Sequence, residues 1–260
     1  MLNAARQHFP LLWSFTHREI SFRFAGSVLG GSWALLGPVL LLGIYSLVFG
    51  QLFRQRADLS TESYTFYVAL GLWPWMMFAD GLLRGMMSIQ TNASIVKKIA
   101  FPHVLLVVAA VSAVFLQHLA GYLLVLLLLI TTGTGTIKPA GIPPAIIQLL
   151  LLFGFTLGIA MILASLQTFL RDIEQAIIPA VMMLHYLTPV MYPPSLIPAN
   201  YRWILDYNPL AVSITRIREN LLVGPTVVTA DILLVIVTFA ALLIGYAMFA
   251  RLSPHFEDFL

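Results

Sequence analysis

The chain has 260 residues, of which 60% are hydrophobic and only 10% are charged, whereas a water-soluble domain carries about 25% charged residues. One membrane-spanning helix uses about 20 apolar residues, so this composition supplies about six spans. A soluble enzyme or a secreted disulfide-stapled domain is excluded, because neither could keep such a surface in water. The sequence has no cysteine, which excludes a thiolate metal site and a redox pair, and its net charge of +3 is too small for a nucleic-acid-binding protein.

The first 24 residues carry too many charged side chains for a signal peptide. Pro10 suits the first turn of a helix, and the apolar residues that follow it fall on two opposite sides with charges between them. This pattern predicts a helix at the membrane interface, within an N-terminal cytoplasmic segment of residues 1–30. The residues expected at this interface are Trp13, Arg18, Glu19 and Arg23.

Six apolar stretches follow, and each is continuous rather than alternating, so they predict helices and not barrel strands. We expect a single-domain, all-α integral membrane protein, with a six-span bundle over residues 31–250 and a cytoplasmic tail over residues 251–260. The expected spans are 33–53, 67–88, 104–130, 145–166, 176–191 and 231–249.

An even number of spans places both termini on one side of the membrane. Lysine and arginine number eight on the face with the termini and six on the other. The bias strengthens when only short connections count, because the connection over residues 193–230 is long. We therefore expect both termini in the cytoplasm.

The long connection between the fifth and sixth spans is divided by prolines into two segments that are too short and too charged to span. We expect two short re-entrant helices here, because irregular backbone at membrane depth needs protein or a water-filled cavity to satisfy it. A pathway would be lined or gated at this place. The residues concerned are Pro193, Pro194, Tyr201, Arg202, Trp203, Pro209, Arg216 and Arg218.

Motifs for chemistry are missing from the sequence: it has no GxxxxGK[ST] phosphate loop, no HExxH and no GxSxG. We therefore expect no catalytic residue, no metal site and no cofactor in this chain. Asp80 and Arg84, four residues apart in the second span, would each cost about 2.5–3.5 kcal/mol at the bilayer centre. The two residues either line a polar pathway or, as we favour, form a pair at the membrane interface. His118, Gln148 and His185 are expected to form hydrogen bonds between helices.

Aromatic residues collect near the outer ends of the spans, where they form an interfacial belt or, alternatively, stack on a sugar or lipid carrier in a cavity. The candidates for such a pathway are Trp73, Trp75, Tyr186 and Tyr192.

Two inner connections concentrate polar residues, one after the second span and one after the fourth. They are either ordinary loops or docking surfaces for a soluble partner that supplies energy. The residues are Asn92, Lys97, Lys98, Phe101, Pro102, Arg171, Asp172 and Glu174.

Four stretches in this order resemble the membrane subunit of ABC-2 type exporters, in particular the permeases that export O-antigen, capsule and teichoic acid. They are REISFRFAGSVLGGSWALLGPVLLLGIYSLVFG from Arg18, GLWPWMMFADGLLRGMMSIQTNASIVKKIAFP from Gly71, RDIEQAIIPAVMMLHYLTPVMYPPSLIPANYRWILDYNPLA from Arg171, and the C-terminal GYAMFARLSPHFEDFL. Together these stretches cover most of the chain except the third span and the loop after it.

This resemblance implies a homodimer in the bacterial inner membrane, with two copies of a separate ATPase subunit that binds Mg-ATP. It also implies that residues 92–102 form the coupling helix, the N-terminal segment an interface helix, and the two short helices a periplasmic gate. The implied substrate is a polysaccharide on an undecaprenyl pyrophosphate or another lipid carrier, and VKKIAFP looks closer to the O-antigen and teichoic-acid branch. The alternatives are a permease for a drug or small lipid, a non-transporting membrane scaffold and an intramembrane lipid enzyme.

Overall fold

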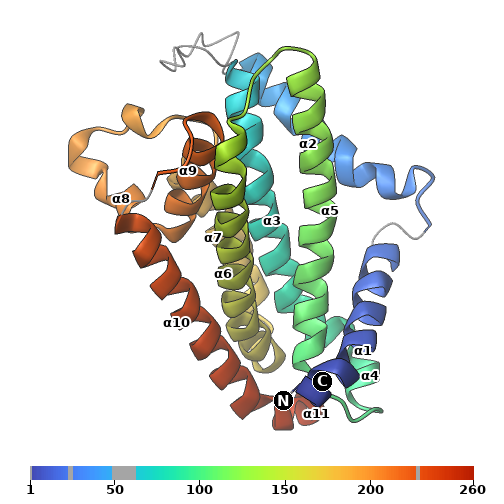
Figure 1. Cartoon of the computed structure of the whole chain (residues 1–260). Coiled ribbons are helices and arrows are strands. Elements are labelled where there is room, and N and C mark those ends of the chain that lie inside the picture. Colours follow the sequence, from blue (N-terminus) through green and yellow to red (C-terminus); the bar gives the residue numbers. More distant parts are fainter. Residues whose placement is uncertain (1, 23–25, 49–62, 227–228) are drawn as a thin grey trace.

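The computed structural model describes residues 2–22, 26–48, 63–226 and 229–260, and within these ranges it contains helices and no strand. The all-α prediction is therefore confirmed. The long helices run side by side as an elongated bundle, and both ends of the chain lie at the same end of it (Figure 1). We name this the terminal end and the opposite one the far end.

Five helices in the described part are long and apolar enough to cross a membrane. Three of them are the 28-residue helices α3, α5 and α6, and the last is α10, with 24 residues. The first candidate span covers Gly30–Val48 and contains α2; residues 49–53 of the expected first span lie outside the described residues. The bounds are α2 Trp33–Tyr45, α3 Tyr64–Thr91, α5 Val104–Thr131, α6 Ile142–Phe169 and α10 Thr229–Leu252.

The expected fifth span differs from the others. It forms α7, Ile173–Leu187, which has 15 residues and is about 22 Å long, against about 30 Å for the hydrocarbon core. The expectation of a helix up to residue 191 was wrong. Pro189 disfavours a helical conformation at the residue before it, and Thr188 is accordingly extended, with φ −110° and ψ 134°.

The remaining helices are shorter or lie at the chain ends. Helix α1 begins upstream of Pro10 and includes it, so the predicted start at that proline was wrong. Between α7 and α10 the chain forms one single-turn helix, α8, and one 14-residue helix, α9. The bounds are α1 Leu2–Phe22, α4 Ala93–Val96, α8 Trp203–Asp206, α9 Pro209–Leu222 and α11 Phe256–Phe259.

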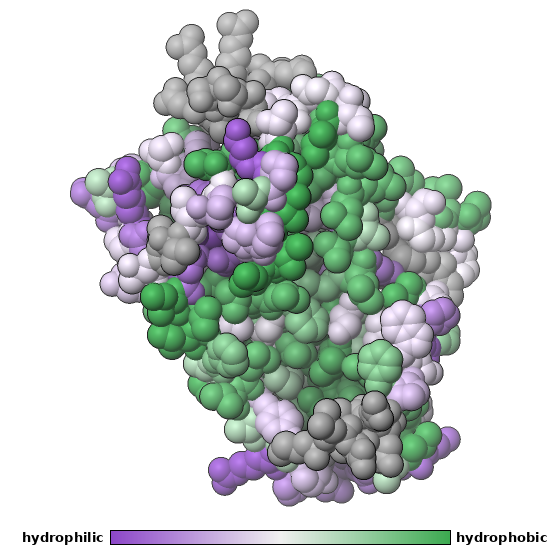
Figure 2. Space-filling model, in the orientation of Figure 1, coloured by the Kyte–Doolittle hydropathy of each residue, from purple (hydrophilic) through white to green (hydrophobic). Residues whose placement is uncertain are grey.

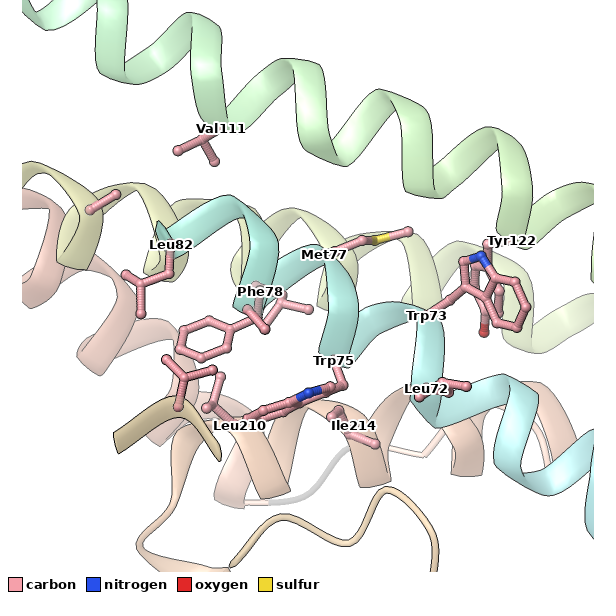
Figure 3. Close-up of a cluster of buried hydrophobic side chains, with 14 of the residues drawn as sticks. Leu72, Trp73, Trp75, Met77, Phe78, Leu82, Val111, Tyr122, Leu210 and Ile214 are labelled. Carbon is pink, nitrogen blue, oxygen red and sulfur yellow. The ribbon is translucent and has the colours of Figure 1, made fainter. Parts of the chain in front are cut away.

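Helix α3 is the central element, in contact with α2, α5, α6, α7 and α9. Its side chains pack outward on several neighbours at once (Figure 3): the Trp73 ring lies 6.4 Å from that of Tyr122 on α5, and Trp75 points toward Ile214 of α9. Both tryptophans are buried. The core therefore surrounds α3 rather than lying between two layers.

Helices α6 and α10 approach each other at glycines. A Cβ on Gly158 would lie 2.5 Å from the carbonyl carbon of Ala241, and one on Gly245 would overlap the carbonyl oxygen of Gly158. Small residues at such positions let helix backbones pack in lipid, where there is no hydrophobic driving force between helices. The surface between the two ends of the bundle is largely apolar (Figure 2), with α10 residues such as Leu243 70% exposed.

Candidate functional sites at the two ends of the bundle

At the terminal end, the connection from α3 to α5 is held by α1. We call residues 92–102 the coupling segment, after the role that the sequence resemblance implies. Asn92 is buried, and its side-chain amide donates to the carbonyl of Ser88 at 2.8 Å. Its side-chain oxygen accepts from Arg18 of α1. The side chain of one residue thus joins the end of α3, the coupling segment and the N-terminal helix.

Aromatic rings make a second connection at this end. The ring of Phe101 lies 5.5 Å from that of Phe15 on α1 and 5.2 Å from that of His103. The Arg18 guanidinium lies 5.0 Å above the Phe15 ring. Lys97, Lys98 and Pro102 remain exposed, whereas Val96 is fully buried. The segment is therefore held at Asn92, Val96 and Phe101, and its lysines face solvent.

The other predicted interface residues lie in different surroundings. Trp13 is 56% exposed, whereas Glu19 forms an ion pair with Arg84 of α3 at 3.4 Å. Arg23 lies outside the described residues. Helix α1 therefore combines an exposed aromatic side chain with charged groups that bind the bundle.

The C-terminal helix α11 packs on the same region. Phe256 is fully buried, and its ring lies 5.2 Å from Phe249, 6.0 Å from Phe169 and 6.3 Å from His103. Burial lowers the pKa of His103, and the charge of Glu257 and a hydrogen bond with the Ser253 backbone offset part of this effect. Sequence reasoning missed this aromatic cluster, although the spacing of Phe249, Phe256 and Phe259 was visible.

The connection between α6 and α7 also lies at the terminal end (Figure 1). Arg171 and Asp172 are exposed and Glu174 is half-buried at the start of α7. Gln167 donates to the carbonyl of Arg171 at 3.3 Å, and Gln90 of α3 donates to the carbonyl of Gln167 at 2.9 Å. Helix α3 therefore supports both polar connections.

At the far end, Arg218 of α9 is 3% exposed. Its guanidinium donates to the carbonyl of Tyr67 at 3.1 Å and to the hydroxyl of Tyr67 at 3.2 Å, and also to the carbonyls of Pro189 and Val190. It lies 4.0 Å from the centre of the Tyr67 ring. Burial lowers the pKa of Arg218. One side chain thus joins α9, α3 and the turn that ends α7.

Gly71 makes room for this guanidinium. A Cβ at that position would overlap the Nη2 atom and would lie 2.9 Å from the Nε atom of Arg218. Tyr67 and Gly71, one helical turn apart on α3, were missed as functional candidates. The available signal was a glycine with a tyrosine four residues before it in an otherwise apolar run.

Arg216, two residues earlier on α9, is bound by acidic groups. It donates from Nε and Nη2 to Asp231 of α10, each at 2.9 Å, and from Nη1 to Glu219 at 2.6 Å and Thr226 at 2.9 Å. Burial disfavours its charge, but these hydrogen bonds outweigh that effect and raise its pKa. Asp231 also accepts from Gln148 of α6 at 2.7 Å, which gives Gln148 the interhelical bond expected from the sequence.

The other predicted gate residues surround α8. A cavity of about 480 Å³ lies beside them, and Pro194, Arg202, Asp206, Arg216 and Glu219 contribute to its lining. Tyr201 and Trp203 are 57% and 59% exposed, while Pro193 and Pro209 are half-buried. The predicted set therefore divides into two buried arginines and an exposed group around α8.

The four candidate pathway aromatics are also divided. Trp73 and Trp75 are buried within the chain, and Trp75 lies 5.0 Å from the ring of His185. Tyr186 is 69% exposed, and Tyr192 donates to its carbonyl at 2.8 Å. Of these four rings, Tyr186 offers by far the most surface to a ligand.

Polar pairs also join helices within the bundle. His118 of α5 lies 2.9 Å from Asp80, and His185 of α7 lies 3.2 Å from the hydroxyl of Tyr45 on α2. Asp80 and Arg84 each contact another helix, α5 and α1 respectively. Among the described residues, no group of three or more histidine, cysteine or acidic side chains could hold a metal ion.

Comparison with known proteins identifies the family of the chain. The family model of ABC-2 type transporters matches residues 10–222. The chain belongs to this family. As an ABC-2 membrane permease it is a transport component rather than an enzyme, and in this family ATP binding lies on a partner subunit.

Individual relatives match along most of the chain. The O-antigen export system permease protein RfbA of Klebsiella pneumoniae is 30% identical over 97% of this chain and 95% of its own length. RfbA of Myxococcus xanthus is 28% identical over 74% of this chain and 71% of its own. The polysialic acid transport protein KpsM of Escherichia coli is 24% identical over 80% of this chain and 79% of its own length.

Proposed function

We propose that this chain is the membrane subunit of an ATP-driven exporter that moves a lipid-linked polysaccharide across the bacterial inner membrane, with O-antigen as the substrate. The observation that carries the proposal is the 30% identity with an O-antigen export permease over 97% of the chain. Capsular polysaccharide is the second candidate, because KpsM matches over 80% of the chain.

The proposed assembly is a homodimer with two copies of the ATPase subunit. Six helices of about 10 Å diameter cannot easily pack on one another and also surround a sugar chain, so two copies form the simpler container. Exposed apolar side chains on α7, among them Met182 and Met183, support α7 as the fifth span and as a surface for the partner copy. In this arrangement both termini lie in the cytoplasm, and the terminal end is the cytoplasmic one.

In the proposed mechanism the coupling segment receives the motion of the ATPase. Lys97 and Lys98 provide exposed positive charge for docking. Phe101 and Asn92 pass the displacement to α1 and α3, since they contact Phe15 and Arg18 on one helix and Ser88 on the other. Arg171, Asp172 and Glu174 form the second docking surface.

At the proposed periplasmic end, α8 and α9 act as the exit gate. The buried arginines fix α9 to α3 and α10, so the part free to move is the exposed region around Tyr201, Arg202 and Trp203. The hydroxyl of Tyr192 donates to the backbone carbonyl of Tyr186, so the two residues lie close together. The ring of Tyr186 offers an aromatic surface to the emerging sugar chain.

Complementation tests this function. The chain and its ATPase partner are expressed in cells that assemble O-antigen but lack their own permease, and surface O-antigen is measured by blotting. Export is expected with the unsubstituted chain, and loss of export with Lys97→Glu combined with Lys98→Glu. Lys138→Glu, at an exposed position at the far end, is the matched control and keeps export. The same pair is expressed in cells that assemble capsular polysaccharide but lack their own permease. Export of capsule from these cells, without export of O-antigen from the first, would overturn the substrate assignment.

Co-purification separates docking from transport. We expect the ATPase subunit to purify with the unsubstituted chain and with Lys138→Glu, and to be lost or weakened with the double lysine variant. An ATPase subunit that binds all three equally, with glycan export intact in each, would overturn the coupling assignment.

A further inference from the structure

Helix α3 is buried on all sides except one. Between Phe66 and Ser88, the residues outside its buried set are Met76, Asp80, Leu83, Arg84 and Met87. Their spacing of three or four residues places them on one face of the helix. We call this the α3 stripe. The most enclosed helix of the bundle thus leaves one narrow face open, and that face carries two charged side chains.

These charges lie deep in the span. Asp80 is eleven residues before the end of α3 at Thr91, which corresponds to about 16 Å along the helix, and Arg84 is about 10 Å from that end. Their side chains are 38% and 41% exposed. Charged groups at such depth almost always face the bundle interior or a water-filled cavity, because exposure to lipid is costly.

The stripe borders a cavity of about 600 Å³. Phe22 of α1 and Glu174 of α7 complete its lining, with Asp80, Leu83, Arg84, Met87 and Thr91 from α3. The cavity therefore extends from the cytoplasmic end of α3, beside the proposed docking surfaces, to the middle of the span.

The charges of this lining favour one class of ligand. Asp80 and Glu174 are acidic, and the one basic side chain of the lining is Arg84. Both members of the α3 pair already have a partner, since Asp80 lies 2.9 Å from His118 and Arg84 lies 3.4 Å from Glu19. The surplus of carboxylates disfavours a phosphate or pyrophosphate. Carboxylates accept O–H donors strongly, and a guanidinium donates to hydroxyl and ether oxygens. Leu83, Met87 and Phe22 supply apolar surface for the C–H faces of sugar rings.

We propose that the α3 stripe lines the cytoplasmic half of the translocation path and binds the hydroxyl groups of the passing glycan, with Asp80 and Glu174 as acceptors and Arg84 as donor. This rests on the proposed function, since it assumes a hydroxyl-rich polymer as the substrate. It assigns the charged pair Asp80 and Arg84 to a pathway rather than to the headgroup region.

Cysteine labelling tests the proposal in the complete complex with the ATPase. The chain has no cysteine, so Asp80→Cys and Met87→Cys each introduce a single thiol. Leu243→Cys, 70% exposed on α10 near the middle of its span, is the lipid-facing control, and Asp258→Cys, at an exposed position on α11, is the aqueous control. A charged, membrane-impermeant thiosulfonate is added to inside-out membrane vesicles.

We expect both stripe cysteines to react at least about tenfold faster than Leu243→Cys, because the reactive thiolate forms only where water reaches it. Complex trapped with lipid-linked glycan should protect Asp80→Cys and Met87→Cys but not Asp258→Cys. Two variants keep the test usable if one of them fails to assemble.

Two outcomes would overturn the proposal. Stripe cysteines as unreactive as Leu243→Cys would mean that lipid or the partner copy covers the stripe. Reactive stripe cysteines without protection by glycan would mean a water-filled space that does not bind the chain. Export of surface glycan by the unsubstituted chain, measured in parallel, separates these results from a failure of the proposed function.

Discussion

The two ends of the bundle use their few charges in opposite ways. At the far end, Arg216 and Arg218 are each 3% exposed, and each donates several hydrogen bonds that reach other elements. At the terminal end, Lys97 and Lys98 are exposed, although the neighbouring Asn92 is buried and bonded to α1 and α3. The buried arginines thus form a fixed framework at the far end, whereas the terminal end presents exposed lysines on a segment that Asn92 holds in place.

Arginine suits the framework because its guanidinium offers five donors in a rigid plane and stays charged when buried. Three of the four acceptors of Arg218 are backbone carbonyls and the fourth is a hydroxyl. Lysine suits the accessible surface, because a flexible stem with a compact charge can follow a moving partner. This difference predicts that substitutions at the far end lower the unfolding free energy of the protein. Substitutions at the terminal end should instead lower the amount of glycan exported per ATP hydrolysed.

The largest effect is expected for Arg218→Ala. It removes the four hydrogen bonds and leaves the carbonyls of Tyr67, Pro189 and Val190 without this donor. A buried polar group left unsatisfied costs about 1–3 kcal/mol, so we expect a loss of about 3 kcal/mol or more of unfolding free energy. Thermal unfolding of the purified complex in detergent measures it. Arg202→Ala, at an exposed position on the same connection, should change little; equal melting temperatures for both variants would contradict the framework.

Gly71→Ala tests the same contact from α3. The new methyl group would overlap the Arg218 guanidinium, and overpacking of this kind costs about 1–3 kcal/mol. In a double-mutant cycle the cost should largely disappear when Arg218→Ala is also present, because the obstructing atoms are gone. Purely additive effects in the melting temperatures would show that Gly71 is required for another reason.

Asn92→Ala tests the terminal end. It removes the acceptor for Arg18 and the donor to Ser88, and a typical hydrogen bond contributes about 1 kcal/mol. We expect only a small fall in melting temperature but a clear fall in glycan exported per ATP hydrolysed, because α1 is no longer tied to the coupling segment. Ser94→Ala, at an exposed position in α4, is the control. An unchanged ratio would show that Asn92 is not needed to transmit the motion.

The sequence predicted the positions of the long helices because apolar runs of this length have one stable form in lipid. It did not show where α7 ends, since the run stays apolar through Val190 and the local effect of Pro189 decides the boundary. Arg216 and Arg218 were both assigned to the gate, but their burial depends on Tyr67, Gly71 and Asp231, which are distant in sequence. Contacts between distant residues have no periodic signal.

The smallest expected effect concerns pH at the terminal end. Burial lowers the pKa of His103 below its usual 6.5. His103 therefore binds a proton less readily when α11 is packed against it than when α11 is detached. The attachment of α11 should therefore be constant above about pH 7 and should weaken as the pH falls through about 6.5. Hydrogen exchange of residues 256–259, corrected for intrinsic rates, measures this opening at pH 7.5 and 5.5. His103→Phe keeps an aromatic ring against Phe256 and should remove the pH dependence; if it persists in that variant, another group controls the tail.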